Sequence, residues 1–410
     1  MKKYVIIGNG HAAVGCIEGI RSVDPDGEIF VVSEEPHHVY SRPLISYYLE
    51  GKTDMERMKY RPDDFYEKCG CRTYFGRRAV SIDTESKRVG LDDGDSLPYD
   101  SLCYAAGSSP FIPPFDGLDS VTAKFSFMTL DDALAVEKAV TKETRVLIVG
   151  AGLIGLKCAE GLHERAGSIV VCDLADRVLS SILDADCAAL MQRRLEDAGI
   201  EFMLGDTAVS FHKNKATMKS GKTVKFDVLI LAVGVRANTK LLAEAGADVN
   251  RGVIVDVRMK TSVENIYAAG DCAEGLDASL GARRVLAILP NAYMQGHAAG
   301  ANMAGGDEVF DNAIPMNSIG FFGLHAMTAG TYEGECYEEK TEDSIKRLFI
   351  KDGCLKGYIL IGRDERAGIY TSLIREKVPL DAVNIREMKR IASNTIFSSE
   401  NRRKRFGGVV

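Results

Sequence analysis

The chain has 410 residues, of which 46% are hydrophobic and 27% are charged, and its formal net charge at pH 7 is −7. This length exceeds one ordinary domain, so two or three soluble globular domains are expected. The negative charge argues against nucleic acid as the main ligand, and no segment approaches the ~20 apolar residues that a membrane-spanning helix needs.

The first residues resemble the start of a secretory signal peptide but do not fulfil its length requirement. Two lysines precede an apolar run, but the run stops at Gly8, too short for the apolar core of a signal peptide. Ten cysteines without secretory features then favour a cytoplasmic location. None of them forms a C-x-x-C pair, so neither a zinc site nor an iron–sulfur cluster is indicated, and we interpret Cys69 and Cys71 as ordinary thiols.

The first predicted unit is a strand, a glycine turn and a helix. Residues 3–7 are an apolar run, and Gly8, Gly10 and Ala13 follow as G-x-G-x-x-A before apolar residues at helical spacing. The first glycine permits a tight turn, the second lets the backbone approach a pyrophosphate, and the small third residue lets helix and strand pack closely. The next strand, "EIFVVSEE", ends at Glu34, whose carboxylate suits ribose hydroxyls.

The same arrangement recurs 142 positions later. "RVLIVGAGLIGLKCAEGL" carries Gly150, Gly152 and Gly155, and the strand "SIVVCD" ends at Asp173. Each helix N-terminus would hold phosphates with its unpaired N–H groups and its dipole. Two such units in one chain indicate two dinucleotide-binding domains.

Three further segments combine an apolar strand with a glycine turn. They are "YDSLCYAAGSSP" (99–110), "FDVLILAVGVRAN" (226–238) and "TSVENIYAAGDCAE" (261–274). The last delivers one carboxylate, Asp271, just past a glycine that allows close ligand approach. Taken alone, Asp271 could instead cap a following helix.

The sequence pattern changes from about residue 341. "IKRLFIKDGCLKGYILIG" alternates around a Lys-Asp-Gly turn and predicts an antiparallel hairpin, and "AGIYTSLIREKV" predicts a helix. These elements indicate a smaller α+β unit. The basic end, "NRRKRFGGVV", is expected to be a solvated tail.

Together these segments resemble the flavoprotein superfamily with two dinucleotide-binding domains, which includes glutathione reductase. The chain is most similar to the single-flavin branch: NADH:rubredoxin oxidoreductases, the flavin portion of assimilatory nitrite reductase, and the flavoproteins encoded beside carbon monoxide dehydrogenase. The resemblance covers nearly the whole chain and also rests on "YSRPLISYYL", "LPNAYMQGHAAGANMAG" and "RAGIYTSLIREK".

The resemblance implies an α/β protein with two Rossmann-like three-layer domains, for FAD and NAD(H), and a small C-terminal α+β domain. The implied bounds are 1–115 and 246–310 for the FAD domain, 116–245 for the NAD(H) domain and 311–410 for the C-terminal domain. The helix that opens at Pro290 would point towards the flavin, where its dipole stabilises negative charge.

Residues at motif positions are implied to hold the two cofactors. For FAD these are Gly8, Gly10, His11, Ala13, Glu34 or its neighbour Glu35, Arg42, Pro43, Ala106, Gly107, Gly270, Asp271, Pro290, Ala292 and Gln295. For NAD(H) they are Gly150, Gly152, Leu153, Ile154, Gly155, Asp173, Arg177 and Gly234. Asp173 favours NADH because a carboxylate accepts from a 2′-hydroxyl and repels a 2′-phosphate, although Arg177 could soften this.

The sequence departs from relatives at two places. The disulfide-reducing branches carry a cysteine on the helix that "SRPLISYYL" predicts, whereas residues 37–52 contain none. Relatives often pair a lysine on that helix with a glutamate in G-x-x-G-x-E, whereas here Tyr47 and Lys157 stand at those positions. We expect Tyr47 and Lys157 near the flavin; the alternative is that Lys157 extends into solvent.

Without a reactive cysteine, electrons must leave through the flavin itself, which suits a small iron–sulfur protein such as rubredoxin or ferredoxin. The leading hypothesis is therefore an NADH-dependent FAD oxidoreductase that exchanges electrons with such a carrier. An NADH oxidase that uses dioxygen and a flavin-bearing subunit of a larger redox complex are the alternatives. No metal, nucleic acid or membrane is expected, and a homodimer is allowed.

Overall fold

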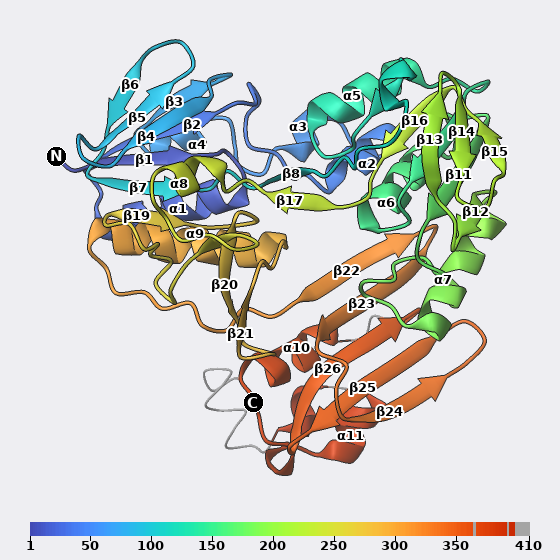
Figure 1. The fold of residues 1–410 in the computed structure, drawn as a ribbon. Helices are drawn as coiled ribbons and strands as arrows, with labels where there is room; N and C mark the ends of the chain where they lie inside the picture. The colour runs from blue at the N-terminus through green and yellow to red at the C-terminus, as the bar shows by residue number, and fades with distance from the viewer. Residues whose placement is uncertain (364–365, 392, 398–410) are drawn as a thin grey trace. The chain divides into compact units, whose positions relative to one another are not determined.

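The computed structural model describes residues 1–363, 366–391 and 393–397 (Figure 1). The chain divides into two compact units. The first unit comprises Met1–Gly275 and Leu289–Phe310, and the second comprises Leu276–Ile288 and the chain from Asp311 onwards. The predicted basic tail, residues 401–410, lies outside the described residues. No helix among the described residues is long and apolar enough to cross a membrane.

A five-stranded parallel sheet forms the first half of the first unit. Its strand order is β19-β7-β1-β2-β3, so a strand from far along the chain completes a sheet begun at the N-terminus. Its central strands are almost entirely buried, as expected for a sheet covered on both faces. The strands are β1 (Lys3–Ile7), β2 (Glu28–Ser33), β3 (Cys71–Phe75), β7 (Ser101–Tyr104) and β19 (Ile266–Ala268).

Two helices of this half pack unusually closely. In α1 (His11–Val23), a Cβ added at Gly15 would lie 2.1 Å from the carbonyl oxygen of Tyr293. In α9 (Leu289–Ala304), a Cβ at Gly296 would lie 2.0 Å from the carbonyl oxygen of Ala12. Gly19 and Gly300 repeat these contacts one turn along each helix. Glycine therefore fixes the distance between α1 and α9.

A second five-stranded parallel sheet has the order β12-β11-β10-β16-β9. Its strands are β9 (Lys124–Phe125), β10 (Arg145–Val149), β11 (Ser168–Asp173), β12 (Glu201–Leu204) and β16 (Val228–Leu231). Its helices are α5 (Leu130–Ala139), α6 (Leu153–Leu162) and α7 (Ala185–Asp197). The two parallel sheets with their helices confirm the predicted pair of Rossmann-type folds.

Short elements complete the first unit. Two three-stranded antiparallel sheets are β4 (Ala79–Asp83), β5 (Arg88–Leu91), β6 (Ser96–Pro98), and β13 (Ala208–His212), β14 (Lys215–Met218), β15 (Thr223–Lys225). Strand β8 (Ser108–Pro110) pairs with β17 (Val235–Ala237), and β18 (Val253–Ile254) pairs with β20 (Ala273–Asp277). The short helices are α2 (Leu44–Leu49), α3 (Met55–Met58), α4 (Phe65–Lys68), α8 (Lys240–Glu244) and the 3-10 turn η1 (Leu118–Ser120).

The second unit is built on an antiparallel sheet with the order β22-β23-β26-β25-β24. The predicted hairpin is confirmed, since β25 and β26 are joined through Asp352 and Gly353, both at positive φ. The strands are β21 (Ala282–Arg284), β22 (Met316–Phe321), β23 (Leu324–Gly330), β24 (Glu335–Lys340), β25 (Ile345–Lys351) and β26 (Cys354–Ile361). The helices are α10 (Ala367–Arg375), which was predicted, α11 (Ile385–Arg390), and the 3-10 turns η2 (Leu380–Ala382) and η3 (Asn394–Ile396).

Candidate functional site

The first glycine loop joins β1 to α1 and leaves room for a ligand. Gly8 has φ 120°, and a Cβ there would lie 2.1 Å from the carbonyl oxygen of Ala105. Gly10 is the N-cap of α1, and a Cβ there would meet no atom within 4 Å. Ala13 is fully buried beneath the loop. The loop thus presents the N-terminus of α1 to open space, as a pyrophosphate site requires.

The second glycine loop, between β10 and α6, repeats this geometry. Gly150 has φ 118°, and a Cβ there would lie 2.2 Å from the carbonyl oxygen of Ala232. Gly152 caps α6 and faces open space, while a Cβ at Gly155 would lie 2.0 Å from the carbonyl oxygen of Gly150. Leu153 and Ile154 form the first turn of α6. The chain therefore offers two helix N-termini of the same construction.

Asp173 lies at the end of β11 beside the second loop. Its Oδ2 accepts a hydrogen bond from the N–H of Ala151 at 2.7 Å, and its Oδ1 accepts one from the N–H of Ala175 at 2.8 Å. The carboxylate therefore stabilises the second glycine loop, and Asp173 is half-buried. Arg177 is bound to Asp176 at 2.8 Å, which leaves less of its charge for a 2′-phosphate. Gly234, with φ 117°, ends the turn after β16.

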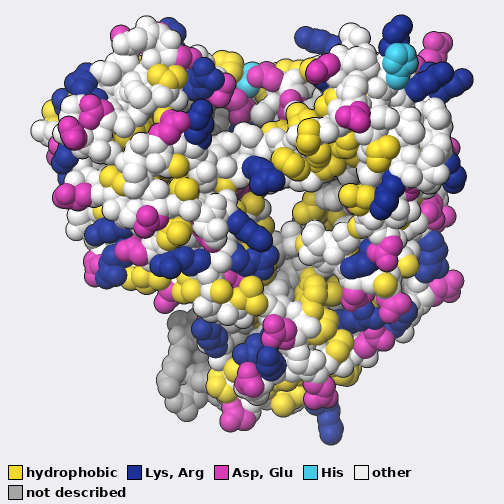
Figure 2. Space-filling model, viewed as in Figure 1, with side chains coloured by type: hydrophobic (Ala, Val, Ile, Leu, Met, Phe, Trp, Pro, Cys, Tyr) yellow, Lys and Arg dark blue, Asp and Glu magenta, His cyan; other side chains and the backbone are white. Residues whose placement is uncertain are grey.

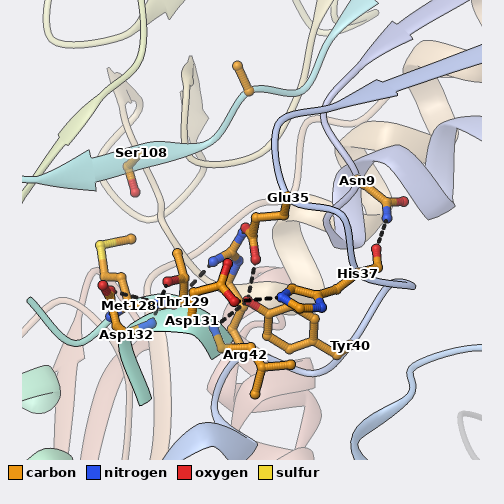
Figure 3. A network of polar contacts seen from close by, with 12 residues as sticks. Asn9, Glu35, His37, Tyr40, Arg42, Ser108, Met128, Thr129, Asp131 and Asp132 are labelled. Atoms are coloured by element: carbon orange, nitrogen blue, oxygen red, sulfur yellow. Dashed lines mark hydrogen bonds and ion pairs between the residues drawn. The ribbon is translucent and has the colours of Figure 1, made fainter. Parts of the chain in front are cut away.

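A polar pocket lies beside the first glycine loop (Figure 3). Glu35 faces this pocket, whereas Glu34 is exposed and does not line it. The difference arises because β2 ends at Ser33, so the chain turns before the two glutamates. The lining residues are Asn9, Gly10, Ser33, Glu35, His37, His38, Tyr40 and Arg42.

Arg42 is held by a network that reaches α5 (Figure 3). It forms an ion pair with Glu35 and donates to the carbonyl oxygen of Met128 at 3.1 Å. Tyr40 donates to Glu35 at 2.6 Å and accepts from the N–H of Leu130 at 2.9 Å. Burial alone would lower the pKa of Arg42, but the oxygens of Tyr40 and Glu35 raise it above its usual range.

The same network includes one histidine contact. His37 Nε2 lies 2.8 Å from Asp131 Oδ1, which is on the first turn of α5. Tyr40 and His37 were missed from the sequence because their partners at Met128–Asp131 are about ninety positions away. Pro43 is the N-cap of α2, directly after Arg42.

The Gly-Asp segment lies close to this pocket. Gly270 has φ 81°, and its N–H donates to the side-chain oxygen of buried Gln295 at 2.8 Å. Asp271 Oδ2 accepts from the hydroxyl of Ser108 at 3.3 Å. Burial raises the pKa of Asp271, while Ser108 and the charge of Arg42 oppose the rise. Residues from four distant segments thus converge on one face.

The remaining predicted positions flank this face. Ala106 and Gly107 lie between β7 and β8, where the carbonyl oxygen of Ala106 accepts from Asn238 at 2.9 Å. Pro290 and Ala292 lie on the first turn of α9. Gly107, with φ 64°, has no atom within 4 Å of a Cβ built on it.

His11 provides a test of whether a cofactor fits the first loop. The residue is 5% exposed, and its ring lies against that of Tyr60, with centroids 4.1 Å apart and planes tilted by 49°. Its Nε2 has no hydrogen-bond partner among the described residues. Burial, with the charges of Arg42 and Arg61, lowers the pKa of His11 to about 4. A neutral imidazole with an unpaired buried nitrogen beside an open helix N-terminus fits a phosphate-bearing group such as FAD.

Tyr47 and Lys157 are brought together where α2 contacts α6. Lys157 Nζ lies 4.9 Å from the centroid of the Tyr47 ring and 2.5 Å from Oε2 of Glu160. The Lys157 side chain is 19% exposed and that of Glu160 is 7% exposed, so the alternative of a solvent-directed lysine does not describe the structure. Glu160 was missed, although its i,i+3 spacing from Lys157 on a helix was readable.

The ten cysteines form no disulfide within the described part of the chain. All ten are free. Burial raises the pKa of six of them, Cys16, Cys69, Cys71, Cys158, Cys172 and Cys272. Cys158 follows Lys157 on α6 but is fully buried. No cluster of three or more metal-binding side chains occurs among the described residues.

Comparisons with known proteins fit this geometry. The chain is 33% identical over 399 residues to the NADH-dependent phenylglyoxylate dehydrogenase subunit epsilon of Aromatoleum evansii, covering 94% of each chain. It is 30% identical to an NADH oxidase of Methanocaldococcus jannaschii, covering 97% of this chain and 94% of that protein. It is also 30% identical to the rubredoxin-NAD(+) reductase of Alcanivorax borkumensis, covering 88% of this chain and 95% of that protein.

Other curated relatives, from Bacillus subtilis, are about twice as long, so that the chain spans about half their length. Residues 2–296 match the sequence profile of one family over both glycine loops and the Gly-Asp segment. The chain therefore belongs to the pyridine nucleotide-disulphide oxidoreductase family.

Proposed function

We propose that this protein is an NADH-dependent FAD oxidoreductase that exchanges electrons with a small iron–sulfur protein. The observation that carries the proposal is the pair of open glycine loops in a chain without a thiol on α2. Two dinucleotides can be held, yet no cysteine is placed to accept electrons from one of them. The rubredoxin-NAD(+) reductase relative supports an iron–sulfur acceptor.

The first loop and the polar pocket would hold FAD. The N-terminus of α1 would bind the pyrophosphate, with His11 beside it, and Glu35 and Arg42 would face the adenosine side. Asp271, kept in place by the Gly270–Gln295 hydrogen bond, would take the ribityl side. When bound, FAD supplies two-electron chemistry towards NADH and one-electron chemistry towards an acceptor.

The second loop would hold NAD(H). The N-terminus of α6 would bind the pyrophosphate, and Asp173 would accept from the ribose 2′-hydroxyl with lone pairs that its two backbone hydrogen bonds leave free. The tie between Arg177 and Asp176 supports NADH over NADPH. No side chain is required to donate or remove a proton, so these groups bind and orient.

Lys157 and Tyr47 would set the electrostatic environment between the two sites. The ammonium of Lys157 is paired with the carboxylate of Glu160 and is covered by the ring of Tyr47. Relatives spread this charge over two helices, whereas here the ion pair lies on α6 alone. The arrangement would favour negative charge on the reduced cofactor while its own net charge stays close to zero.

The acceptor is tested with an anaerobic assay of the FAD-loaded protein. NADH should reduce a rubredoxin or a ferredoxin much faster than it reduces dioxygen in a parallel aerobic assay. Ferricyanide serves as the control acceptor, because its reduction requires only a working NADH and FAD site. Rapid dioxygen consumption with inert iron–sulfur proteins would instead support the oxidase, which the Methanocaldococcus jannaschii relative favours.

A flavin-bearing subunit of a larger complex is the second candidate, because a relative of matching length is named as a subunit. It predicts ferricyanide reduction but no turnover with any free carrier, together with co-purification of a partner from the native host. The cytoplasmic location and the homodimer remain predictions, which fractionation and light scattering would check.

A further inference from the structure

A second feature of the first unit lies away from both glycine loops. A pocket of about 370 Å³ is lined by Arg145, His212, Lys213, Asn214, Lys215 and Lys225. Arg145 begins β10, whereas the Gly150 loop follows the other end of that strand. The pocket and the dinucleotide site are therefore at opposite ends of the same strand.

The pairing of the β13–β14–β15 sheet places basic side chains side by side. His212 is directly opposite Lys215, and Lys215 is directly opposite Lys225. Directly opposite residues share one face of a sheet, and like charges in such positions are destabilising. The alternate residues, Phe211 and Ala216, are buried in the core, so the cationic row is on the outer face.

Carboxylates do not neutralise this row. Arg145 is taken up by Asp227, with Nη2 to Oδ1 at 2.7 Å and Nε to Oδ2 at 2.9 Å. Among the described residues, Lys213, Lys215 and Lys225 form no ion pair, and all three are exposed. The row stays cationic although the whole chain has a net charge of −7. Figure 2 shows Lys and Arg side chains gathered at the upper right, over the end of this sheet.

The chemistry of the pocket distinguishes between anionic ligands. Phosphate sites use arginine forks or free backbone N–H groups, but the Arg145 fork is occupied by Asp227 and the N–H of Lys213 donates to the Ser120 hydroxyl at 2.9 Å. Small-molecule pockets enclose their ligand, whereas all six residues that line this pocket are exposed. Exposed lysines acting as point charges instead suit an extended set of carboxylates.

We propose that this pocket, defined by the six residues above, docks an acidic segment of a partner protein. The inference rests on the proposed function, in which the chain passes electrons to another protein. Because the pocket lies at the far end of β10 from the dinucleotide loop, its role would be to tether the partner and not to receive electrons.

The test measures binding of a fluorescent deca-glutamate peptide to the FAD-loaded protein by anisotropy at low salt. The triple variant Lys213→Glu, Lys215→Glu, Lys225→Glu should bind about tenfold more weakly, as expected from losing several exposed ion pairs. The control triple variant Lys87→Glu, Lys138→Glu, Lys240→Glu makes the same change in net charge at scattered exposed lysines. It should bind nearly as the unmodified chain does.

Equal loss in both triple variants, or no peptide binding by the unmodified chain, would overturn the proposal. Binding of inorganic tripolyphosphate at the pocket without binding of the peptide would also overturn it in favour of a small-anion site. NADH–ferricyanide reduction is measured on every variant. If the unmodified chain does not reduce ferricyanide with NADH, the proposed function is refuted. If it does, but the pocket binds no peptide, only the docking site is refuted.

Discussion

The close contact of α1 with α9 yields the sharpest structural prediction. Gly296 lies on α9, and a Cβ added there would be 2.0 Å from the carbonyl oxygen of Ala12, near the start of α1. The neighbouring atom is backbone, so no side chain can rotate away. Gly296→Ala therefore forces the two helices apart where the first glycine loop enters α1.

The magnitude follows from the required movement. Ordinary van der Waals contact begins near 3.4 Å, so the helices must separate by more than an ångström along this contact. Overpacking of this kind costs about 3 kcal/mol at the upper end of its range, and the better helix propensity of alanine returns about 1 kcal/mol. We expect Gly296→Ala to lower the free energy of unfolding by roughly 2 kcal/mol.

The same displacement should weaken FAD binding by roughly tenfold, because it moves the N-terminus of α1 relative to α9. Urea unfolding of the FAD-free protein, followed by circular dichroism, measures the stability, and quenching of FAD fluorescence measures the affinity. Gly368→Ala is the matched control, since Gly368 is an exposed residue of α10 with no atom within 4 Å of its added Cβ. It should be neutral or stabilise by up to about 1 kcal/mol.

An unfolding free energy and an FAD affinity unchanged in Gly296→Ala would refute this reasoning. A stability loss of the same size in Gly368→Ala would refute it as well, because that site has space for the methyl group.

Four further predictions concern the site. Asp173→Ala should narrow the preference for NADH over NADPH, measured as the ratio of kcat/KM values; an unmodified chain that prefers NADPH would contradict the assignment. Alkylation of the thiols should leave electron transfer from NADH largely intact, and a stoichiometric loss that NADH prevents would restore a thiol mechanism. Lys157→Met should lower the flavin midpoint potential and slow reduction by NADH while FAD stays bound. Glu160→Gln should raise the midpoint potential. An unchanged potential in Lys157→Met would show that the charge of Lys157 does not affect the flavin. For His11, burial lowers the folded-state pKa to about 4 from 6.5, so the unfolded chain takes up the proton first. Stability of the FAD-free protein should therefore be fullest above pH 6.5 and fall by up to roughly 3 kcal/mol as the pH drops to about 4. His11→Asn should flatten that fall in pH-dependent unfolding, and an equally steep fall in the variant would contradict it.

The glycine loops were predictable because their requirements are local. A turn with positive φ at Gly8 and Gly150, and a helix N-terminus that faces open space at Gly10 and Gly152, are encoded within about six residues each. The hairpin at Asp352 was readable for the same reason. Short-range geometry of this kind leaves a pattern in a single sequence.

The rest depends on contacts between distant residues. Whether Glu34 or Glu35 faces the pocket is decided by where β2 ends, which shifts by a residue without changing the pattern. The α1–α9 contact joins residues more than 270 positions apart, such as Gly15 and Tyr293. The sequence around a glycine of one helix therefore does not show why glycine is needed there. The partner of Tyr40 on α5, Leu130, could not be predicted for the same reason.

The most direct test of the central claim is an anaerobic titration of the purified protein with NADH, followed by addition of oxidised rubredoxin or ferredoxin. The account predicts one non-covalent FAD per chain and no iron, loss of the visible flavin absorbance with one equivalent of NADH, and its full return as the iron–sulfur protein becomes reduced. Extraction of FMN or stoichiometric iron, or a flavin that NADH reduces but no iron–sulfur protein reoxidises, would contradict it.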